Sequence, residues 1–340
     1  MTTYLVTGGA GFIGSNYIHF LLESDPGVRI INLDKLTYCG NLENLRDVEK
    51  DPRYRFVRGD IADRKLVEEI LAERVDVVVN FAAETHVDRA VLGPEEFIRT
   101  DVLGTFNLLE AARDKGVGRY IQISTDEVYG SIAEGAFTEE SPLNPSSPYS
   151  SGKAGGDLIA RSYFVTYGMD VCITRCSNNF GPYQYPEKVI PLFVTNALED
   201  RALPLYGDGL NERDWLYVGD HCEAIQLVVE KGQKGQIYNI GTGETLPNIQ
   251  LTETILDILG KPKSLIQRVE DRPGHDRRYC VDSSRIRQLG WKPRHDFDSA
   301  IRETIEWYAE HPSWWKPLKS GEYLSYYKEQ YGRRKILEES

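Results

Sequence analysis

The sequence predicts an α/β protein built on a doubly wound parallel sheet, with a smaller, interleaved α/β lobe. Short apolar segments alternate with segments of helical periodicity through the first half of the chain. A glycine-rich turn follows the first apolar segment, as it does where a sheet of this kind binds a ligand. With 340 residues, 41% of them hydrophobic, the chain is long enough to bury a large core.

Composition narrows the kinds of partner. The formal net charge of −12 disfavours nucleic acid or an anionic membrane as the main partner. Five scattered cysteines without a CxxC pair predict reduced thiols in the cytoplasm and no metal site. No secretory signal is predicted at the N-terminus, and no apolar run is long enough to span a bilayer.

The opening segment predicts a dinucleotide site. Residues 4–7 form a short apolar strand, and residues 15–23 have helical periodicity. Between them lies Gly-Gly-Ala-Gly-Phe-Ile-Gly, in which Gly9, Gly11 and Gly14 fit the spacing GxGxxG and Gly8 fits a second spacing, GxxGxxG. Such glycines allow a tight turn and close approach of the backbone to a pyrophosphate, which the following helix N-terminus can bind. The alternative interpretation is a glycine-rich turn without a ligand.

Asp34 favours NAD over NADP. It ends a second strand, residues 29–33, and lies twenty residues past Gly14. A carboxylate at this distance can accept hydrogen bonds from the ribose 2′-hydroxyl, and it would repel a 2′-phosphate.

Further strands complete a Rossmann sheet. Strands are predicted at residues 55–61, 75–80 and 120–124, and helices at residues 64–73 and 97–114. Ligands bind at the carboxyl ends of parallel strands. Residues 124–127 follow the fifth strand, so we expect them at the active-site edge.

Tyr149 and Lys153 form a candidate redox pair. Pro148 favours a helix start, and a spacing of four residues places both side chains on one helix face. The lysine ammonium and the positive nicotinamide are expected to lower the pKa of Tyr149 so that it can act as a base. Tyr331 and Lys335 have the same spacing, but they lie in an aromatic tail whose pattern is typical of packing.

These residues, together with four further segments, resemble those of a known family. Residues 8–14, Asp34, Ser124 and the Tyr149/Lys153 pair resemble the extended short-chain dehydrogenase/reductase superfamily. Four segments narrow the resemblance to the dTDP-glucose 4,6-dehydratase family: FAAETHVD at 81–88, TDEVYG at 125–130, SNNFGPY at 177–183 and RPGHDRRY at 272–279. The Thr125-Asp126-Glu127 triplet is the most specific, because epimerases of the superfamily usually carry serines there.

The resemblance implies a hydro-lyase that converts dTDP-glucose to dTDP-4-keto-6-deoxyglucose on bound NAD. Tyr149, assisted by Thr125 and Lys153, would act in C4 oxidation. Glu127 would remove the C5 proton, and Asp126 would protonate the departing 6-hydroxyl. Asp126 must then be protonated while Glu127 is ionised, and two neighbouring carboxyls tend to have pKa values that are pushed apart.

The resemblance also implies binding residues. For the cofactor they are Gly8, Gly11, Phe12, Ile13, Gly14, Asp34, Lys35, Leu36, Thr37, Asp60, Ile61, Phe81, Ala82, Ala83, Thr85, Thr100, Ser124, Tyr149, Lys153 and Asn179. For the sugar nucleotide they are Thr85, Thr125, Asn178, Lys188, Val189, Pro191, Leu192, Phe193, Pro204, Leu205, Tyr206, Arg213, Asn248, Arg272 and His275. A homodimer through a four-helix bundle is implied as well.

We expect an NAD-binding domain at residues 1–176 with a returning segment at about 214–245. Residues 177–213 and 246–340 would then form the substrate-binding lobe. Three alternatives stay open: a 4,6-dehydratase for UDP-glucose or another nucleotide-glucose, a sugar-nucleotide epimerase, and a non-catalytic NAD-sensing module.

Overall fold

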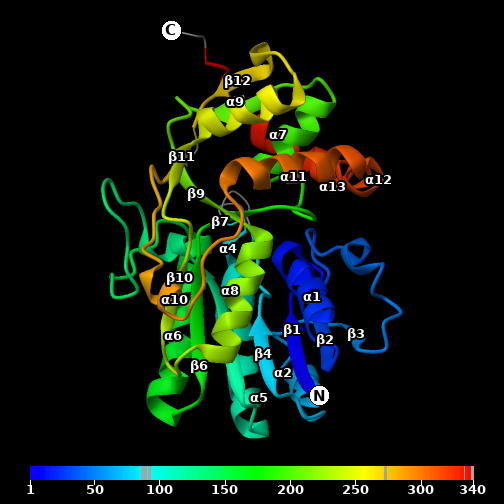
Figure 1. Cartoon of the computed structure of the whole chain (residues 1–340), viewed down its shortest axis with the longest axis vertical. Coiled ribbons are helices and arrows are strands. Elements are labelled where there is room, and N and C mark those ends of the chain that lie inside the picture. Colours follow the sequence, from blue (N-terminus) through cyan, green and yellow to red (C-terminus); the bar gives the residue numbers. More distant parts are fainter. Residues whose placement is uncertain (86–89, 91–92, 272–273, 333, 338–340) are drawn as a thin grey trace.

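A seven-stranded, wholly parallel sheet carries the fold (Figure 1). The computed structural model describes residues 1–85, 90, 93–271, 274–332 and 334–337. The strands lie in the order β10-β6-β5-β4-β1-β2-β3. Their bounds are β1 (Thr2–Thr7), β2 (Val28–Asp34), β3 (Tyr54–Arg58), β4 (Val77–Asn80), β5 (Arg119–Thr125), β6 (Val171–Cys176) and β10 (Ile237–Ile240). The strand order reverses between β1 and β4, which is where a doubly wound sheet binds its ligand.

Helices cover both faces of this sheet, as the sequence predicts. On one face lie α1 (Phe12–Ser24) and α8 (Val218–Lys231), and on the other α2 (Arg64–Leu71), α5 (Thr105–Lys115) and α6 (Pro148–Tyr167). Alternate side chains of β1 supply the two cores: Tyr4 and Val6 join the first, and Leu5 joins the second. This alternation explains why the strands read as continuous apolar runs.

A smaller lobe lies above the carboxyl edge of the sheet in Figure 1. It contains a three-stranded sheet of β7 (Asn178–Phe180), β9 (Glu212–Tyr217) and β11 (Thr245–Pro247), and the pair β8 (Leu203–Tyr206) and β12 (Ile266–Val269). Its helices are α7 (Val189–Leu198), α9 (Asn248–Leu259), α11 (Phe297–Glu310), α12 (Pro312–Leu318) and α13 (Glu322–Tyr331). The aromatic tail packs into the core of this lobe, as predicted.

The two parts are interleaved along the chain. Strand β9, expected to return the chain to the first domain, instead pairs with β7 and β11. The chain rejoins the large sheet through α8 and β10, and the short helix α10 (Ser284–Gln288) lies beside β10. The domain boundaries given above stay a prediction.

Two elements differ from their predicted bounds. The third strand stops at Arg58, before Asp60. The next residue, Gly59, packs so tightly on Leu66 of α2 that an added Cβ would lie 2.0 Å from a Leu66 methyl carbon. The predicted helix at 97–114 begins with α4 (Pro94–Phe97) and passes through a π-helical segment, η2 (Ile98–Gly104), before α5. Short 3-10 turns occur at η1 (Leu42–Leu45), η3 (Asp126–Tyr129) and η4 (Lys263–Leu265). No described helix combines the length and apolar character needed to cross a membrane.

Candidate active site

Two cavities meet at the carboxyl edge of the large sheet. The first is lined by the glycine-rich turn, the ends of β2, β4 and β5, and the start of α6. The second lies in the smaller lobe between β8, β9, α7 and α9. Four residues line both cavities: Glu127, Asn178, Glu187 and Lys188. A ligand in one cavity can therefore reach a ligand in the other.

The glycine-rich turn fits a dinucleotide. Gly8 has a φ of +68°, and a Cβ there would lie 2.7 Å from the backbone nitrogen of Ala82. A Cβ on Gly14 would lie 2.4 Å from the carbonyl oxygen of Gly8. Only glycine permits this close turn, which places the N-terminus of α1 against the cavity, where its backbone N–H groups can bind phosphate.

Asp34 stands at the end of β2 with its carboxylate held in place. One oxygen accepts the N–H of Ala10 at 2.9 Å, and the other accepts the N–H of Leu36 at 2.7 Å. Burial raises the pKa of Asp34, and these two hydrogen bonds lower it. Each carboxylate oxygen has a further lone pair, so the side chain fits the ribose hydroxyl that the sequence analysis assigns to it.

The predicted cofactor residues, Leu36 excepted, line the first cavity. Leu36 is not among the described residues that line it, and its N–H serves to orient Asp34. Asp60 also lines this cavity, where its carboxylate lies 3.1 Å from the Lys35 ammonium.

The Thr125-Asp126-Glu127 triplet forms the junction between β5 and the 3-10 turn η3. The Thr125 hydroxyl accepts the N–H of Glu127 at 3.3 Å and donates to a carboxyl oxygen of Asp126 at 3.3 Å. Asp126 is 2% exposed. Burial, followed by the charges of Glu127 and Asp214, holds the pKa of Asp126 well above its usual range. This raised pKa favours the protonated form of Asp126, which is the direction that the predicted role as an acid requires.

Helix α6 carries Tyr149 and Lys153 into the same cavity. It begins with a capping box, in which the side chains of Ser147 and Ser150 each accept the other residue's backbone N–H. The Lys153 ammonium donates to the carbonyl of Ile123 at 2.7 Å.

The protein's own groups raise the pKa of Tyr149, and the predicted lowering in the presence of oxidised nicotinamide stays a prediction. Burial raises the pKa of Tyr149 well above its usual value, and the charges of Glu127 and Asp101 raise it further. An interaction with the Thr125 hydroxyl lowers it only in part. The sequence argument also counted the positive charge of oxidised nicotinamide, which a bound cofactor would have to supply.

Most of the predicted substrate residues line the cavities. Thr85 and Thr125 line the first, and the second is lined by Asn178, Lys188, Val189, Leu192, Phe193, Pro204, Leu205, Tyr206, Arg213, Asn248 and His275. Pro191, which lies buried within α7, is not among the described lining residues. Arg272 lies outside the described residues.

Four residues of the second cavity escaped the sequence analysis: Glu187, Trp215, Tyr279 and Tyr331. Glu187 and Tyr279 stand within or beside segments that carry the resemblance, so proximity to those motifs could have suggested them. Tyr331 was interpreted as a packing residue. It does stack on Tyr206, with ring centroids 5.9 Å apart, but it also forms part of the cavity wall.

Arg213 places a positive charge in the wall of the second cavity. Its guanidinium donates to the backbone carbonyls of Glu212 at 2.7 Å and Asp276 at 2.9 Å, and it lies 4.2 Å from the centroid of the Tyr279 ring. The same charge acts to lower the pKa of Asp126. Arg213 is therefore held in place by backbone carbonyls in the wall of the second cavity, close enough to Asp126 to affect its pKa. His275 contacts the carboxylate of Asp271 at 2.6 Å.

Comparisons with known proteins show which family the chain belongs to. Residues 5–304 match the profile of the GDP-mannose 4,6 dehydratase family. The dTDP-glucose 4,6-dehydratase of Streptomyces antibioticus is 54% identical over 93% of this chain and 95% of its own. The enzyme of that name from Neisseria meningitidis serogroup B is 46% identical, over 95% of this chain and 98% of its own.

Solved structures of related enzymes have the same fold as this chain. DesIV, a dTDP-glucose 4,6-dehydratase from Streptomyces venezuelae with NAD and TYD bound, superimposes with a TM-score of 0.91 at 53% identity and covers 94% of this chain and 100% of its own. A UDP-glucose 4-epimerase from Thermotoga maritima reaches a TM-score of 0.85 at 30% identity, over 91% of this chain and 99% of its own. The chain therefore belongs to the dTDP-glucose 4,6-dehydratase family.

Proposed function

We propose that this protein is an NAD-dependent hydro-lyase that converts dTDP-glucose to dTDP-4-keto-6-deoxyglucose. One observation carries the proposal: Asp126, whose pKa is raised by burial, and its neighbour Glu127 share a cavity with Tyr149 and Lys153. Relatives at about half identity over almost the whole chain bear the name of this activity. An oxidoreductase would need the tyrosine and lysine, and the extra acid and base support an elimination within the redox cycle.

Three side chains transfer protons in the proposed reaction, and Thr125 and Lys153 assist them. Tyr149 takes the proton of the sugar 4-hydroxyl, while Thr125 hydrogen-bonds that oxygen and Lys153 supplies positive charge. The resulting 4-ketone acidifies the C5 proton, which Glu127 removes. Asp126 protonates the 6-hydroxyl, which leaves as water, and a proton then returns to C5. Bound NAD supplies the remaining chemistry, because it accepts hydride from C4 and returns hydride to C6.

The alternatives make different demands on the site. A 4-epimerase expels no water, so it has no use for an acid at C6, and a module that only senses NAD has no use for the four reactive side chains. A UDP-glucose dehydratase would use the same catalytic residues and differ only in the nucleotide pocket. We assign that pocket to the second cavity, where Pro204, Leu205 and Tyr206 form one wall.

Incubation with dTDP-glucose in D₂O tests the proposal. The product should be a 4-keto-6-deoxy sugar with deuterium at C5, seen by mass spectrometry and NMR, without net formation of NADH. Because the hydride passes internally from C4 to C6, this transfer should add no deuterium from the solvent at C6. The same product from UDP-glucose alone would keep the mechanism and change the substrate, whereas no conversion of any nucleotide-glucose would refute the proposed reaction.

A homodimer is part of the proposal. Two neighbouring helical segments expose large apolar side chains: Ile98, Leu103 and Phe106 on η2 and α5, and Leu158, Val165 and Tyr167 on α6. Two such segments from each of two copies would form a four-helix bundle and bury these side chains.

Leu158→Glu should therefore convert a dimer into a monomer in sedimentation velocity, because it places a charge within the proposed interface. Leu324→Glu is the matched control, since Leu324 is similarly exposed on α13 of the other lobe. A monomeric wild-type protein would contradict the proposed dimer.

A reducing compartment such as the cytoplasm is also proposed. All five cysteines are free, and Cys172, Cys176, Cys222 and Cys280 are buried. Burial raises the pKa of the Cys222 thiol above its usual value, as it does for the other buried thiols. Such thiols are suited to packing in their reduced form.

A further inference from the structure

A buried arginine connects the two halves of the catalytic machinery. Arg175 lies on β6, directly beside Ser124 of β5 in the parallel register. Its Nε donates to the carboxylate of Asp157 at 2.9 Å, and one terminal nitrogen donates to the hydroxyl of Tyr129 at 2.8 Å. The side chains of this ion pair are 4% and 1% exposed, so the pair lies in the interior and is poorly screened by solvent.

The two partners of Arg175 belong to different catalytic elements. Tyr129 is the last residue of η3, the single turn that carries Asp126 and Glu127. Asp157 lies one helical turn beyond Lys153 on α6. One guanidinium therefore fixes the acid–base turn relative to the tyrosine–lysine helix.

The network continues from Tyr129 to the edge of the sheet. The Tyr129 hydroxyl donates to the side-chain oxygen of Asn239 on β10 at 2.8 Å. The backbone N–H of Asn239 donates to Glu139 at 3.0 Å, and its side-chain amide donates to the carbonyl of Phe137 at 3.1 Å. The rings of Tyr129 and Phe137 also stack, with centroids 5.1 Å apart.

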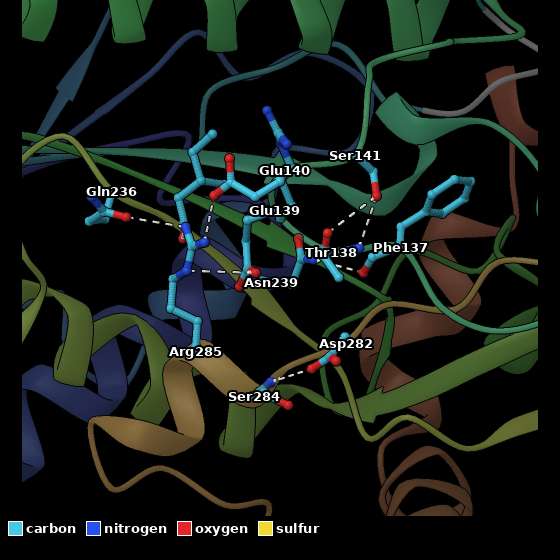
Figure 2. A network of polar contacts seen from close by, with 12 residues as sticks. Phe137, Thr138, Glu139, Glu140, Ser141, Gln236, Asn239, Asp282, Ser284 and Arg285 are labelled. Atoms are coloured by element: carbon cyan, nitrogen blue, oxygen red, sulfur yellow. Dashed lines mark hydrogen bonds and ion pairs between the residues drawn. The ribbon is translucent and has the colours of Figure 1, made fainter.

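Figure 2 shows the polar contacts that Arg285 makes with the residues around Asn239. Arg285 of α10 lies 3.7 Å from the carboxylate of Glu139, donates to Glu140 at 2.7 Å and contacts Gln236 at 3.2 Å. Glu139 and Glu140 belong to residues 131–147, the segment between the catalytic triplet and Tyr149. This segment is therefore anchored to β10 and α10 on the side away from the cavities.

The proposed reaction makes the relative placement of the two halves critical. Oxidation at C4 and elimination across C5 and C6 act on adjacent atoms of one sugar, so both sets of side chains must be aligned with one bound substrate. A displacement of about 1 Å can cost a reaction step on the order of 10²-fold. A rigid support for both sets is what such chemistry requires.

We propose that Arg175, Tyr129 and Asp157 are positioning residues that hold the Asp126–Glu127 turn in register with Tyr149 and Lys153. Through them, oxidation and elimination stay matched on the same sugar. The inference rests on the proposed dehydration, and it assigns to these three residues no direct contact with substrate.

Tyr129→Phe tests the turn side of the network. It keeps the ring, its stacking on Phe137 and its packing under Arg175, and it removes only the bridging hydroxyl. We expect C4 oxidation to continue while elimination slows, so that NADH accumulates on the enzyme and absorbs at 340 nm during turnover. The kcat should fall about 10- to 100-fold, with the KM for dTDP-glucose within about twofold of wild type.

Asp157→Asn tests the helix side, and Tyr163→Phe is the control. Asp157→Asn should slow the appearance of NADH rather than its disappearance, because α6 carries the residues of the oxidation step. Tyr163 lies on the same helix and donates its hydroxyl to Glu110 at 2.5 Å, outside the network. Its phenylalanine variant removes an equivalent buried hydroxyl and should keep kcat within about twofold.

Opposite stopped-flow signatures for the two network variants would support positioning. A general loss of folding would instead slow both phases alike in both variants. A Tyr129→Phe enzyme with the kcat of the control and no NADH absorbance would overturn the proposal.

Hydrogen exchange separates this inference from the proposed function. If the wild-type protein converted no nucleotide-glucose, the proposed function would fail, but exchange of the backbone amides of residues 126–130 could still be compared. Faster exchange in Tyr129→Phe than in Tyr163→Phe would support the network's hold on η3. Identical exchange would count against it.

Discussion

Replacing Tyr149 with phenylalanine is expected to lower kcat by about 10²- to 10⁴-fold, the range that a positioned general base contributes. The variant keeps the ring in its pocket against Phe97, whose centroid lies 6.3 Å away, and loses only the phenolic oxygen. No other group in the proposed mechanism accepts the proton of the 4-hydroxyl. In a single-turnover experiment with dTDP-glucose, the absorbance of NADH at 340 nm should not appear.

Tyr163→Phe again provides the control, because it removes a buried hydroxyl from the same helix without touching the cavity. It should form NADH at the wild-type rate. NADH formation by Tyr149→Phe at a comparable rate would show that another group removes the proton, and the assignment of Tyr149 would be wrong. Loss of bound NAD from the variant, measured after denaturation, would point instead to a binding role.

The fold could be predicted because its signals are local. Strand, turn, helix and acid follow one another over residues 2–34, and each has its own sequence signature. The candidate catalytic residues could also be predicted from the sequence, since Asp126 and Glu127 come directly after a strand and Tyr149 lies at a helix start. The parallel topology then brings these separate segments to one edge.

The second cavity shows where local signals end. Tyr331 lies on a C-terminal helix whose aromatic pattern indicates packing, and only the folding of that helix against β8 makes it part of a cavity wall. Arg175 gave no signal at all, because a single arginine in an apolar strand is not a motif. Its proposed role depends on two hydrogen-bond partners, Asp157 and Tyr129, that are distant from it in sequence.

The effect of the protein's own groups on the pKa of Tyr149 could not be predicted from the sequence, for a different reason. The sequence shows Lys153 one helical turn away, but it does not show burial, which is the largest effect, or the carboxyls of Glu127 and Asp101 nearby. The same burial raises the pKa of Asp126, where the direction agrees with the proposed role. The burial of a titratable group therefore predicts its pKa shift better than the sequence distance to a charged residue on the same helix.

Asp126→Asn is expected to separate oxidation from elimination. Asparagine preserves the volume of the side chain and can still accept a hydrogen bond from Thr125, but it cannot protonate the departing 6-hydroxyl. Turnover should fall by about 10²- to 10⁴-fold, as for loss of a general acid. Stopped-flow absorbance at 340 nm should show NADH forming and persisting, and mass analysis of quenched samples should find a 4-keto sugar that retains its 6-hydroxyl.

The pH dependence of the wild-type enzyme provides an independent check on the same residue. Because burial and the charges of Glu127 and Asp214 raise the pKa of Asp126, the carboxyl is protonated below that raised pKa. Elimination should therefore slow as the pH rises through it, and bound NADH should accumulate at high pH in the wild type. Asp126→Asn should lack this pH-dependent change.

Asp63→Asn serves as the charge-matched control for both experiments, since Asp63 caps α2, is not among the described residues that line either cavity, and asparagine caps helices equally well. It should leave both the NADH transient and its pH profile unchanged. Failure of Asp126→Asn to form any NADH would place Asp126 in the oxidation step. The acid at C6 would then have to be another group, with Glu127 the other carboxyl of the triplet.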